Sequence, residues 1–246
     1  MKSNLKNVVL KYKSLIGLLI LCIVISFITP RFLTGPNIKN IFTQVSGNAV
    51  IAIGMTFVIL TGGIDLSVGS ILAVSGAVAA SIIKTTGNLY LAIIVALAIG
   101  CAIGLINGIL VSKGRIQAFI VTLATMTIFR GVTYVYTNGT PISGLGQSFS
   151  GIGNKMFLGF PIPVILTILV FGIAFYVLSQ TRYGRYLYAL GGNEDSARLS
   201  GINTGKIKTL VYVICGATAA LSGIIVASRI GSASPNAGVG FELDAI

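Results

Sequence analysis

The chain has 246 residues, of which 54% are hydrophobic and 9% are charged, and its net charge is +12. A soluble domain carries about 25% charged residues, so this composition and a mean hydropathy of +0.96 indicate an integral membrane protein. The sequence has no histidine, which removes the commonest general base and metal ligand; it has no P-loop, and no basic face with interleaved aromatic residues that would favour nucleic-acid binding.

A basic N-terminus, residues 1–14, precedes the first apolar run at 15–28. A signal peptide would need a cleavage site with small residues, and Thr29-Pro30-Arg31-Phe32 is a poor one. We therefore predict a retained first span with a cytoplasmic N-terminus, followed by a polar loop over 30–40.

The second span, predicted over 41–60, carries several polar side chains. Gln44 and Asn48 are four residues apart and share one helix face. Amides are costly in lipid, so they should face other helices or a wet cavity. Two roles stay open for them: hydrogen bonds between helices, or the lining of a translocation path.

A polar break separates the second span from the third, predicted over 66–83. Thr61-Gly62-Gly63 interrupts the helix because glycine costs backbone entropy, and Asp65 or Ser67 can then cap the next helix. Such a break is typical of a turn at a membrane face, of a re-entrant pair, and of broken helices beside a transport path. Candidate path residues are Gln44, Asn48, Thr56, Asp65, Ser67 and Ser70.

The later apolar spans contain two further signals. Gly100, Gly104 and Gly108 lie on one helix stripe, which predicts close packing against another helix. For Arg130 we favour snorkelling to the interface, with an ion pair or a place beside the path as alternatives. Residues 137–160 are predicted to form an extracytoplasmic loop. The later spans are predicted over 89–111, 116–136, 161–178 and 209–228.

Residues 179–208 form the longest charged polar stretch. Asn193 is a good N-cap, Glu194 and Asp195 fall in the first turn where the helix dipole favours anions, and Gly201 is a natural stop. The stretch predicts a small amphipathic helix at the cytoplasmic surface. It is either a solvated connector or a docking element for a partner.

The predicted fold is an all-α polytopic membrane protein with about seven transmembrane helices in this chain. With the N-terminus inside, the cytoplasmic segments hold eleven Lys and Arg residues and the outer segments hold five. This bias supports the predicted orientation, because cytoplasmic loops of membrane proteins are enriched in Lys and Arg.

Five stretches carry a specific resemblance: GMTFVILTGGIDLSVGS (54–70), KGRIQAFIVTLATM (113–126), RGVTYVYTNGTP (130–141), TRYGRYLYALGGNEDSARLSGINTGKIK (181–208) and GFELDAI (240–246). Together they resemble the ribose-type monosaccharide permeases of binding-protein-dependent ABC importers. The resemblance implies about ten spans in a bacterial cell-membrane protein. We therefore expect residues 15–246 to form one permease domain, incomplete at its C-terminus.

The family resemblance also implies a coupling loop between the sixth and seventh spans that docks into the ATPase subunit. Carried onto this sequence, its residues are Gly191, Gly192, Asn193, Glu194, Asp195, Ala197, Arg198, Gly201 and Ile202. They resemble the Glu-Ala-Ala…Gly docking loop of other importers, with departures at Asp195 and Ser196.

The implied function is translocation of ribose or a similar monosaccharide by ATP-driven alternating access. The implied partners are a cytoplasmic ABC ATPase that binds ATP and Mg, an extracytoplasmic sugar-binding protein, a second permease copy and membrane lipid, with no cofactor and no enzyme activity in this chain. The alternative is an ion-coupled secondary carrier or channel for small polar solutes, which should need intramembrane carboxylates. Asp65 is the only acidic residue before Glu194.

Overall fold

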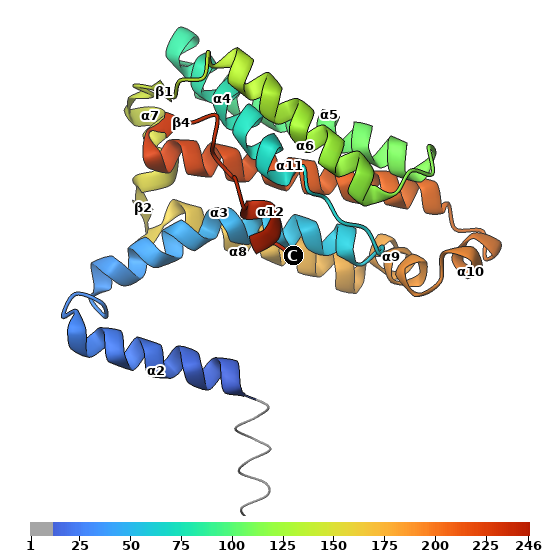
Figure 1. Cartoon of the computed structure of the whole chain (residues 1–246), viewed down its shortest axis with the longest axis horizontal. Coiled ribbons are helices and arrows are strands. Elements are labelled where there is room, and N and C mark those ends of the chain that lie inside the picture. Colours follow the sequence, from blue (N-terminus) through green and yellow to red (C-terminus); the bar gives the residue numbers. More distant parts are fainter. Residues whose placement is uncertain (1–11) are drawn as a thin grey trace, which may run out of the picture. The chain divides into compact units, whose positions relative to one another are not determined.

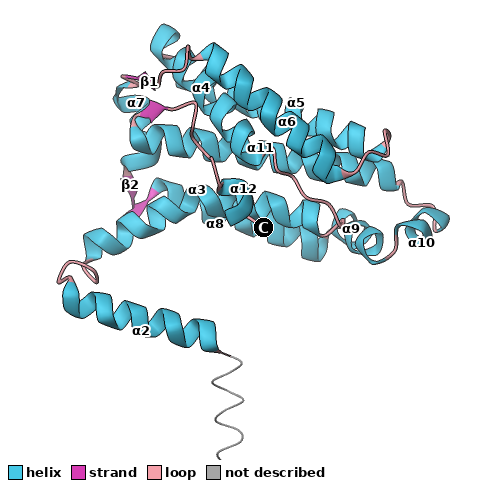
Figure 2. Ribbon diagram, viewed as in Figure 1, coloured by secondary structure: helices cyan, strands magenta, loops and turns pink. Residues whose placement is uncertain are grey.

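The structure is a computed structural model that describes residues 12–246, so most of the basic N-terminus predicted over 1–14 lies outside the described residues. The chain divides into two compact units, Met1–Phe42 and Thr43–Ile246. Over the described residues, helices dominate and strands are limited to four two-residue pieces (Figure 2).

The first unit contains α2 (Lys13–Ile28), which corresponds to the first predicted span. Its 16 residues are apolar on all sides, and none of its side chains is buried. A helix needs about 20 apolar residues to cross a bilayer. The helix covers the predicted span at 15–28 and is shorter than a typical membrane-spanning helix.

Six helices in the described part of the chain are long and apolar enough to cross a membrane. Each overlaps one of the remaining predicted spans, which confirms the all-α polytopic fold class. They are α3 (Gly35–Ile59), α4 (Val68–Thr86), α5 (Leu89–Ser112), α6 (Ala118–Tyr136), α8 (Ile162–Gln180) and α11 (Thr204–Ile230).

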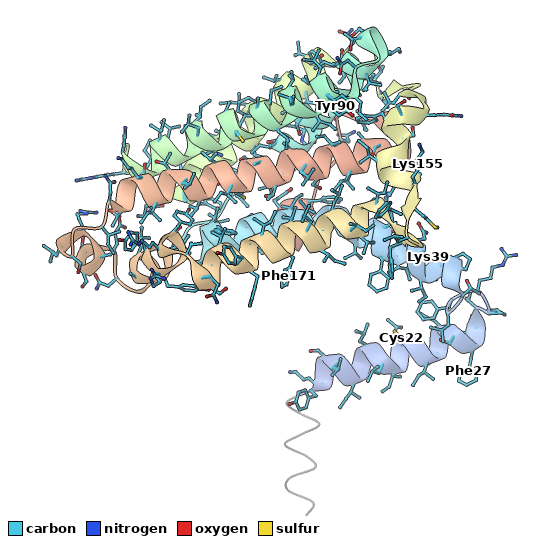
Figure 3. The ribbon with its side chains drawn as sticks, turned by 180° about the vertical axis from the view of Figure 1, so that it is seen from behind. Cys22, Phe27, Lys39, Tyr90, Lys155 and Phe171 are labelled. Carbon is cyan, nitrogen blue, oxygen red and sulfur yellow. The ribbon has the colours of Figure 1, made fainter. Side chains whose placement is uncertain are left out.

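The core of the second unit is built by α4, α5 and α11, which pack against one another (Figure 1). Helix α4 is rich in glycine, alanine and serine, and 72% of its most apolar 18-residue stretch is buried. In α8 only 6% of the corresponding stretch is buried. Its large side chains, such as Phe171, are exposed (Figure 3), as expected of a helix that faces lipid or another subunit.

Glycine allows α5 to approach α11 at backbone distance. A methyl carbon on Gly100 would overlap the carbonyl oxygen of Gly216, and one on Gly104 would overlap that of Tyr212. At Gly108 the added carbon would lie 2.7 Å from the Thr209 carbonyl oxygen. The predicted close-packing stripe is confirmed.

The segment predicted as an extracytoplasmic loop contains structure of its own. It holds α7 (Gly146–Asn154), β1 (Ile142–Ser143), β2 (Met156–Phe157) and the start of β3 (Phe160–Pro161). Strand β1 pairs antiparallel with β4 (Ser232–Ala233), and β2 pairs with β3. Helix α7 buries Phe149 and packs on the end of α11.

Arg130 differs from the snorkelling interpretation. Its Nη1 donates to the carbonyl oxygens of Pro235 at 2.7 Å and of Ala237 at 2.8 Å. The guanidinium therefore holds the irregular segment that precedes α12 (Phe241–Asp244). The segment needs such a partner because two of its carbonyls would otherwise lack hydrogen bonds.

Candidate functional site

The polar stretch between the sixth and last spans folds into two short helices, α9 (Arg182–Gly192) and α10 (Glu194–Leu199). The chain turns sharply out of α8 because Gly184 packs against the carbonyls of Val177 and Leu178, and Thr181 caps α9 by accepting from Gly184 N at 3.2 Å. Leu187 is buried on the inner side of α9. Sequence analysis predicts one small helix here, and the structure has two.

Asn193 separates these helices. Its Oδ1 accepts from Ser196 N at 2.8 Å, which confirms the predicted N-cap of α10. The boundary between α9 and α10 lies at Asn193, because α9 continues through Gly191 and Gly192. A methyl carbon on Gly191 would overlap the Leu60 carbonyl oxygen, so the end of α9 packs directly on the residue that follows α3.

The C-terminus of α10 is closed by a Schellman motif. Gly201 has a φ of +81°, and its N–H donates to the Arg198 carbonyl at 3.0 Å. The Ile202 N–H donates to the Ala197 carbonyl at 3.1 Å. Ala197 is buried and Ile202 packs against the core, so the predicted stop at Gly201 is confirmed and anchored by apolar contact.

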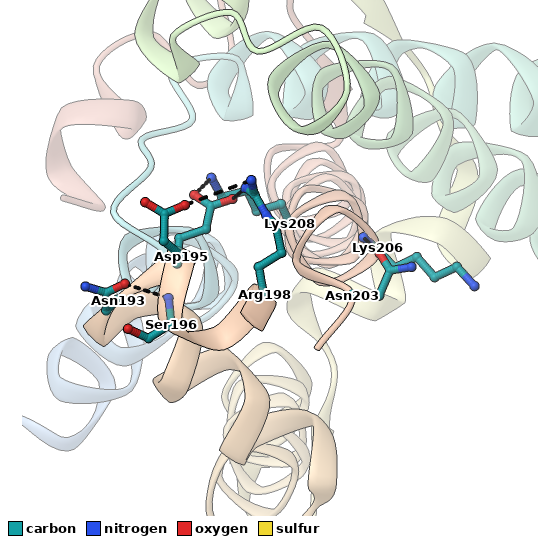
Figure 4. A network of polar contacts seen from close by, with 8 residues as sticks. Asn193, Asp195, Ser196, Arg198, Asn203, Lys206 and Lys208 are labelled. Carbon is teal, nitrogen blue, oxygen red and sulfur yellow. Dashed lines mark hydrogen bonds and ion pairs between the residues drawn. The ribbon is translucent and has the colours of Figure 1, made fainter. Parts of the chain in front are cut away.

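Glu194 ties α10 to the base of α11, and Figure 4 shows Lys208 of α11 beside Arg198 of α10. Its carboxylate accepts from Lys208 Nζ and, at 3.2 Å, from Arg198 Nη2. The Lys208 hydrogen bond lowers the pKa of Glu194 below its ordinary value. Asp195 is different: its side chain is 88% exposed and lies 3.9 Å from Arg198. Lys208 is 14 residues from Glu194 and belongs to another helix, so no spacing within one helix indicates the pair, and sequence reasoning missed it.

Leu199, at the end of α10, is a second residue that sequence reasoning missed. It is 89% exposed on an otherwise polar surface segment, while Ala197 two residues earlier is buried. It is the large apolar side chain that α10 presents to its surroundings. The signal in the sequence was a single leucine between charged and polar residues.

The candidate path residues of α3 have different surroundings. Gln44 lines a cavity of about 440 Å³ between α4, the end of α11 and the segment leading to α12. Asn48 donates to Asp244 Oδ2 at 3.1 Å. Thr56 donates at 2.8 Å to the carbonyl of Ala52 in its own helix.

Asp65, Ser67 and Ser70 are all fully buried. Asp65 Oδ1 accepts from Ser67 N at 2.9 Å and from Ser67 Oγ at 2.5 Å. Asp65 therefore caps the N–H of Ser67 at the start of α4, whereas Ser67 itself makes no side-chain cap bond. Ser70 donates to the Ser67 carbonyl at 2.8 Å. The structure thus does not bring the six candidate path residues together.

A second cavity, of about 560 Å³, lies beside the coupling segment. Ile64 and Arg115 line it together with Glu194, Lys208 and Tyr212. Lys208 and Tyr212 belong to the first turns of α11, whereas the Gln44 cavity is lined by its last turns. Since α11 has 27 residues and each adds about 1.5 Å, the two cavities lie toward opposite ends of the bundle.

Comparison with known proteins gives consistent relatives. Residues 37–246 match the family described as "Branched-chain amino acid transport system / permease component". The chain is 54% identical over 243 residues to the ribose import permease protein of Escherichia coli (strain K12), covering 96% of this chain and 75% of the relative.

Two other relatives extend the comparison. Identity to the ribose import permease protein of Bacillus subtilis (strain 168) is 50%, over 98% of this chain and 75% of the relative. Identity to the D-allose transport system permease protein of Escherichia coli (strain K12) is 40%, over 96% of this chain and 73% of the relative. No solved structure matches the chain.

Proposed function

The chain belongs to the family of permease components of the branched-chain amino acid transport system, and we propose that it imports ribose or a similar monosaccharide. It is a multi-pass permease subunit of an ABC importer in the plasma membrane, and it is not itself an enzyme. The observation that carries the choice of sugar is the 50 to 54% identity to ribose import permeases, against 40% to the D-allose permease.

The coupling element in this proposal is the segment 191–202. Its inner side is fixed to the permease by Ala197, by Gly191 against the end of α3, and by the Glu194–Lys208 ion pair. Its outer side presents Asp195 and Leu199. A segment that is rigid toward its own subunit and that exposes Asp195 and Leu199 can transmit motion of a bound ATPase into α11 and α3.

The proposed sugar path runs past Gln44 through the cavity of about 440 Å³, a size in the range of small-molecule sites. Asn48 lies on the same helix face and its partner Asp244 belongs to α12, so both amides stand on the path side of α3. Asp65, Ser67 and Ser70 line neither cavity, and we place them outside the path.

The remaining parts of the assembly follow from the importer class. The cytoplasmic ATPase partner supplies ATP binding with Mg, and an extracytoplasmic sugar-binding protein delivers the cargo. We propose that a second permease copy and lipid contact the exposed faces of α6 and α8. Only 22% and 6% of the most apolar 18-residue stretches of these two helices are buried. We also propose a cytoplasmic N-terminus, which puts 191–202 on the ATPase side.

The test is co-purification and uptake with a matched pair of variants. Leu199→Ser removes the exposed apolar side chain, and Ser200→Ala changes its exposed neighbour. We expect Leu199→Ser to lose most of the ATPase that a tagged permease retains in mild detergent, and most ribose uptake, while Ser200→Ala keeps both.

Full retention by Leu199→Ser would contradict the docking assignment. Uptake that stops with an ionophore and continues after ATP depletion would instead support the ion-coupled carrier.

A further inference from the structure

Asp65 is a fully buried carboxyl in the turn between α3 and α4, outside both membrane-spanning helices. Its Oδ1 accepts hydrogen bonds from both the backbone N–H and the hydroxyl of Ser67. Asn107 of α5, also fully buried, donates from Nδ2 to Ser67 Oγ at 2.9 Å. Because Ser67 uses its only proton on Asp65, Asn107 must be the donor in this bond, and its amide orientation is fixed.

Three oxygen atoms of this cluster lack a hydrogen-bond partner among the described residues: Asp65 Oδ2, Asn107 Oδ1 and the Tyr212 hydroxyl. Asn107 Oδ1 can only accept, and an ionised Asp65 Oδ2 can also only accept. The donors beside Asp65 are all neutral: the Tyr212 hydroxyl, the Cys215 thiol and the Asn107 amide, so none of them compensates a buried negative charge. A proton on Oδ2 removes that charge and makes Oδ2 a donor.

The neighbours of Asp65 offer no positive charge. The titratable groups that face it are Tyr212 and Cys215, both from α11, while α5 contributes the neutral Asn107. Thr122 of α6 reaches the adjacent Ile64 carbonyl at 3.4 Å. Burial raises the pKa of the Asp65 carboxyl above its ordinary value, and burial outweighs the hydrogen bonds that lower it. An unpaired buried charge is avoided in proteins by neutralisation.

We propose that Asp65 is a proton-binding site, occupied at neutral pH, in which a neutral carboxylic acid donates from Oδ2 and holds the 61–67 turn to α5 and α11. The same turn supplies Gly63 and Ile64 to the cavity beside Glu194 and Lys208. The proton therefore stabilises the surface on which the coupling segment rests. This assignment does not depend on which solute the protein carries.

Infrared spectroscopy tests the proposal on the intact wild-type chain. The sequence has three aspartates, and two of them, Asp195 and Asp244, are exposed. If every aspartate carries ¹³C at its carboxyl carbon, a label-sensitive band of a protonated carboxyl at neutral pH therefore reports on Asp65. We expect a carboxylic-acid carbonyl band at neutral pH that shifts with the label. The absence of a label-sensitive band would overturn the proposal.

A pair of variants gives an independent measurement. Asp65→Asn is nearly isosteric with the neutral acid, and Asp195→Asn is the matched exposed control. A raised pKa in the folded protein means that wild-type stability declines as pH rises above about 4, the unfolded aspartate pKa. We expect the unfolding temperature of Asp65→Asn, relative to that of the wild type, to increase as pH rises from about 4 to about 8. A loss that grows over this range would show that Asp65 is ionised.

Discussion

Glu194 is the residue on which the placement of α10 depends most directly. It faces inward to Lys208, while its neighbour Asp195 faces solvent. Two adjacent acids thus have separate roles, although both fit the first-turn pattern equally well in sequence. Only the position of Lys208, across the loop, distinguishes them.

We expect Glu194→Gln to reduce sugar uptake several-fold while ATP hydrolysis by the assembled importer continues, because the ion pair to α11 is lost and α10 loses one of its inward attachments. Asp195→Asn, the matched control, should keep uptake near wild type, since its ion pair is exposed and long. Uptake and ATPase activity of the two variants in proteoliposomes check this prediction. Equal loss in both variants would mean that overall negative charge, and not the tether, matters.

Acidification should act through the same carboxylate. The pKa of Glu194 is lowered in the folded protein, so the stability it contributes is present above the ordinary value of 4.5 and is lost as pH falls through the lowered pKa. The amides of α10 should therefore exchange slowly at about pH 6 to 7, and their exchange rate should rise in a step as pH falls below about 4.5. Glu194→Gln should show no such step.

At the scale of elements, the contact between α5 and α11 limits which side chains the bundle can accept. Gly104 lies against the backbone of Tyr212 and Val213, whereas Gly172 on α8 has no atom within 4 Å of an added carbon. Both are glycines inside apolar helices, and their spacing to other glycines is the only sequence signal that separates them.

We expect Gly104→Ala to destabilise the protein by about 1–3 kcal/mol, the usual cost of overpacking. Gly172→Ala should be neutral or slightly stabilising, since alanine favours helix by about 1 kcal/mol over glycine. Thermal unfolding in detergent, monitored by loss of monodisperse protein, measures the difference. Unchanged stability of Gly104→Ala would mean that the two helices separate more easily than the backbone contact indicates.

The existence of each long helix was predictable from its apolar run, but its ends were not always so. Helices α3 and α11 begin at Gly35 and Thr204, before the predicted starts at 41 and 209, because polar residues continue the helix outside the apolar run. The caps were predictable where they are local, as with Asn193 and Gly201. Helix α9 was not predicted, because the glycine pair at 191–192 suggests a break in the chain; in the structure Gly191 packs against Leu60 and the helix continues through it. Arg130 was misread because its carbonyl partners lie more than 100 residues away.

At the scale of the whole molecule, the sequence resemblance predicted the family and its importer class, which the relatives confirm. The candidate path was less predictable. Polar residues in spans were grouped because a polar side chain is unfavourable in lipid, yet these side chains find hydrogen-bond partners in different places. Thr56 donates to a carbonyl of its own helix, and Ser67 donates to the buried carboxyl of Asp65. Composition does not say which polar group remains available to a solute.

The membrane orientation can be tested directly. In a variant whose three cysteines are replaced, we expect Gln147→Cys, in α7, to react with a membrane-impermeant maleimide on intact cells. Leu199→Cys, in α10, should react only after the membrane is opened, because Lys and Arg are concentrated on its side. Labelling of Leu199→Cys on intact cells would invert the proposed orientation.

The hydroxyls that donate to carbonyls of their own helices have a kinetic consequence. Thr56, Ser75 and Thr125 each have their single proton engaged within the helix that carries them. Because these protons are satisfied within each helix, neighbouring helices can shift against one another without breaking a hydrogen bond at these groups. The rate at which the bundle changes shape then depends on how fast packed side chains rearrange, and not on the rupture of bonds at these hydroxyls.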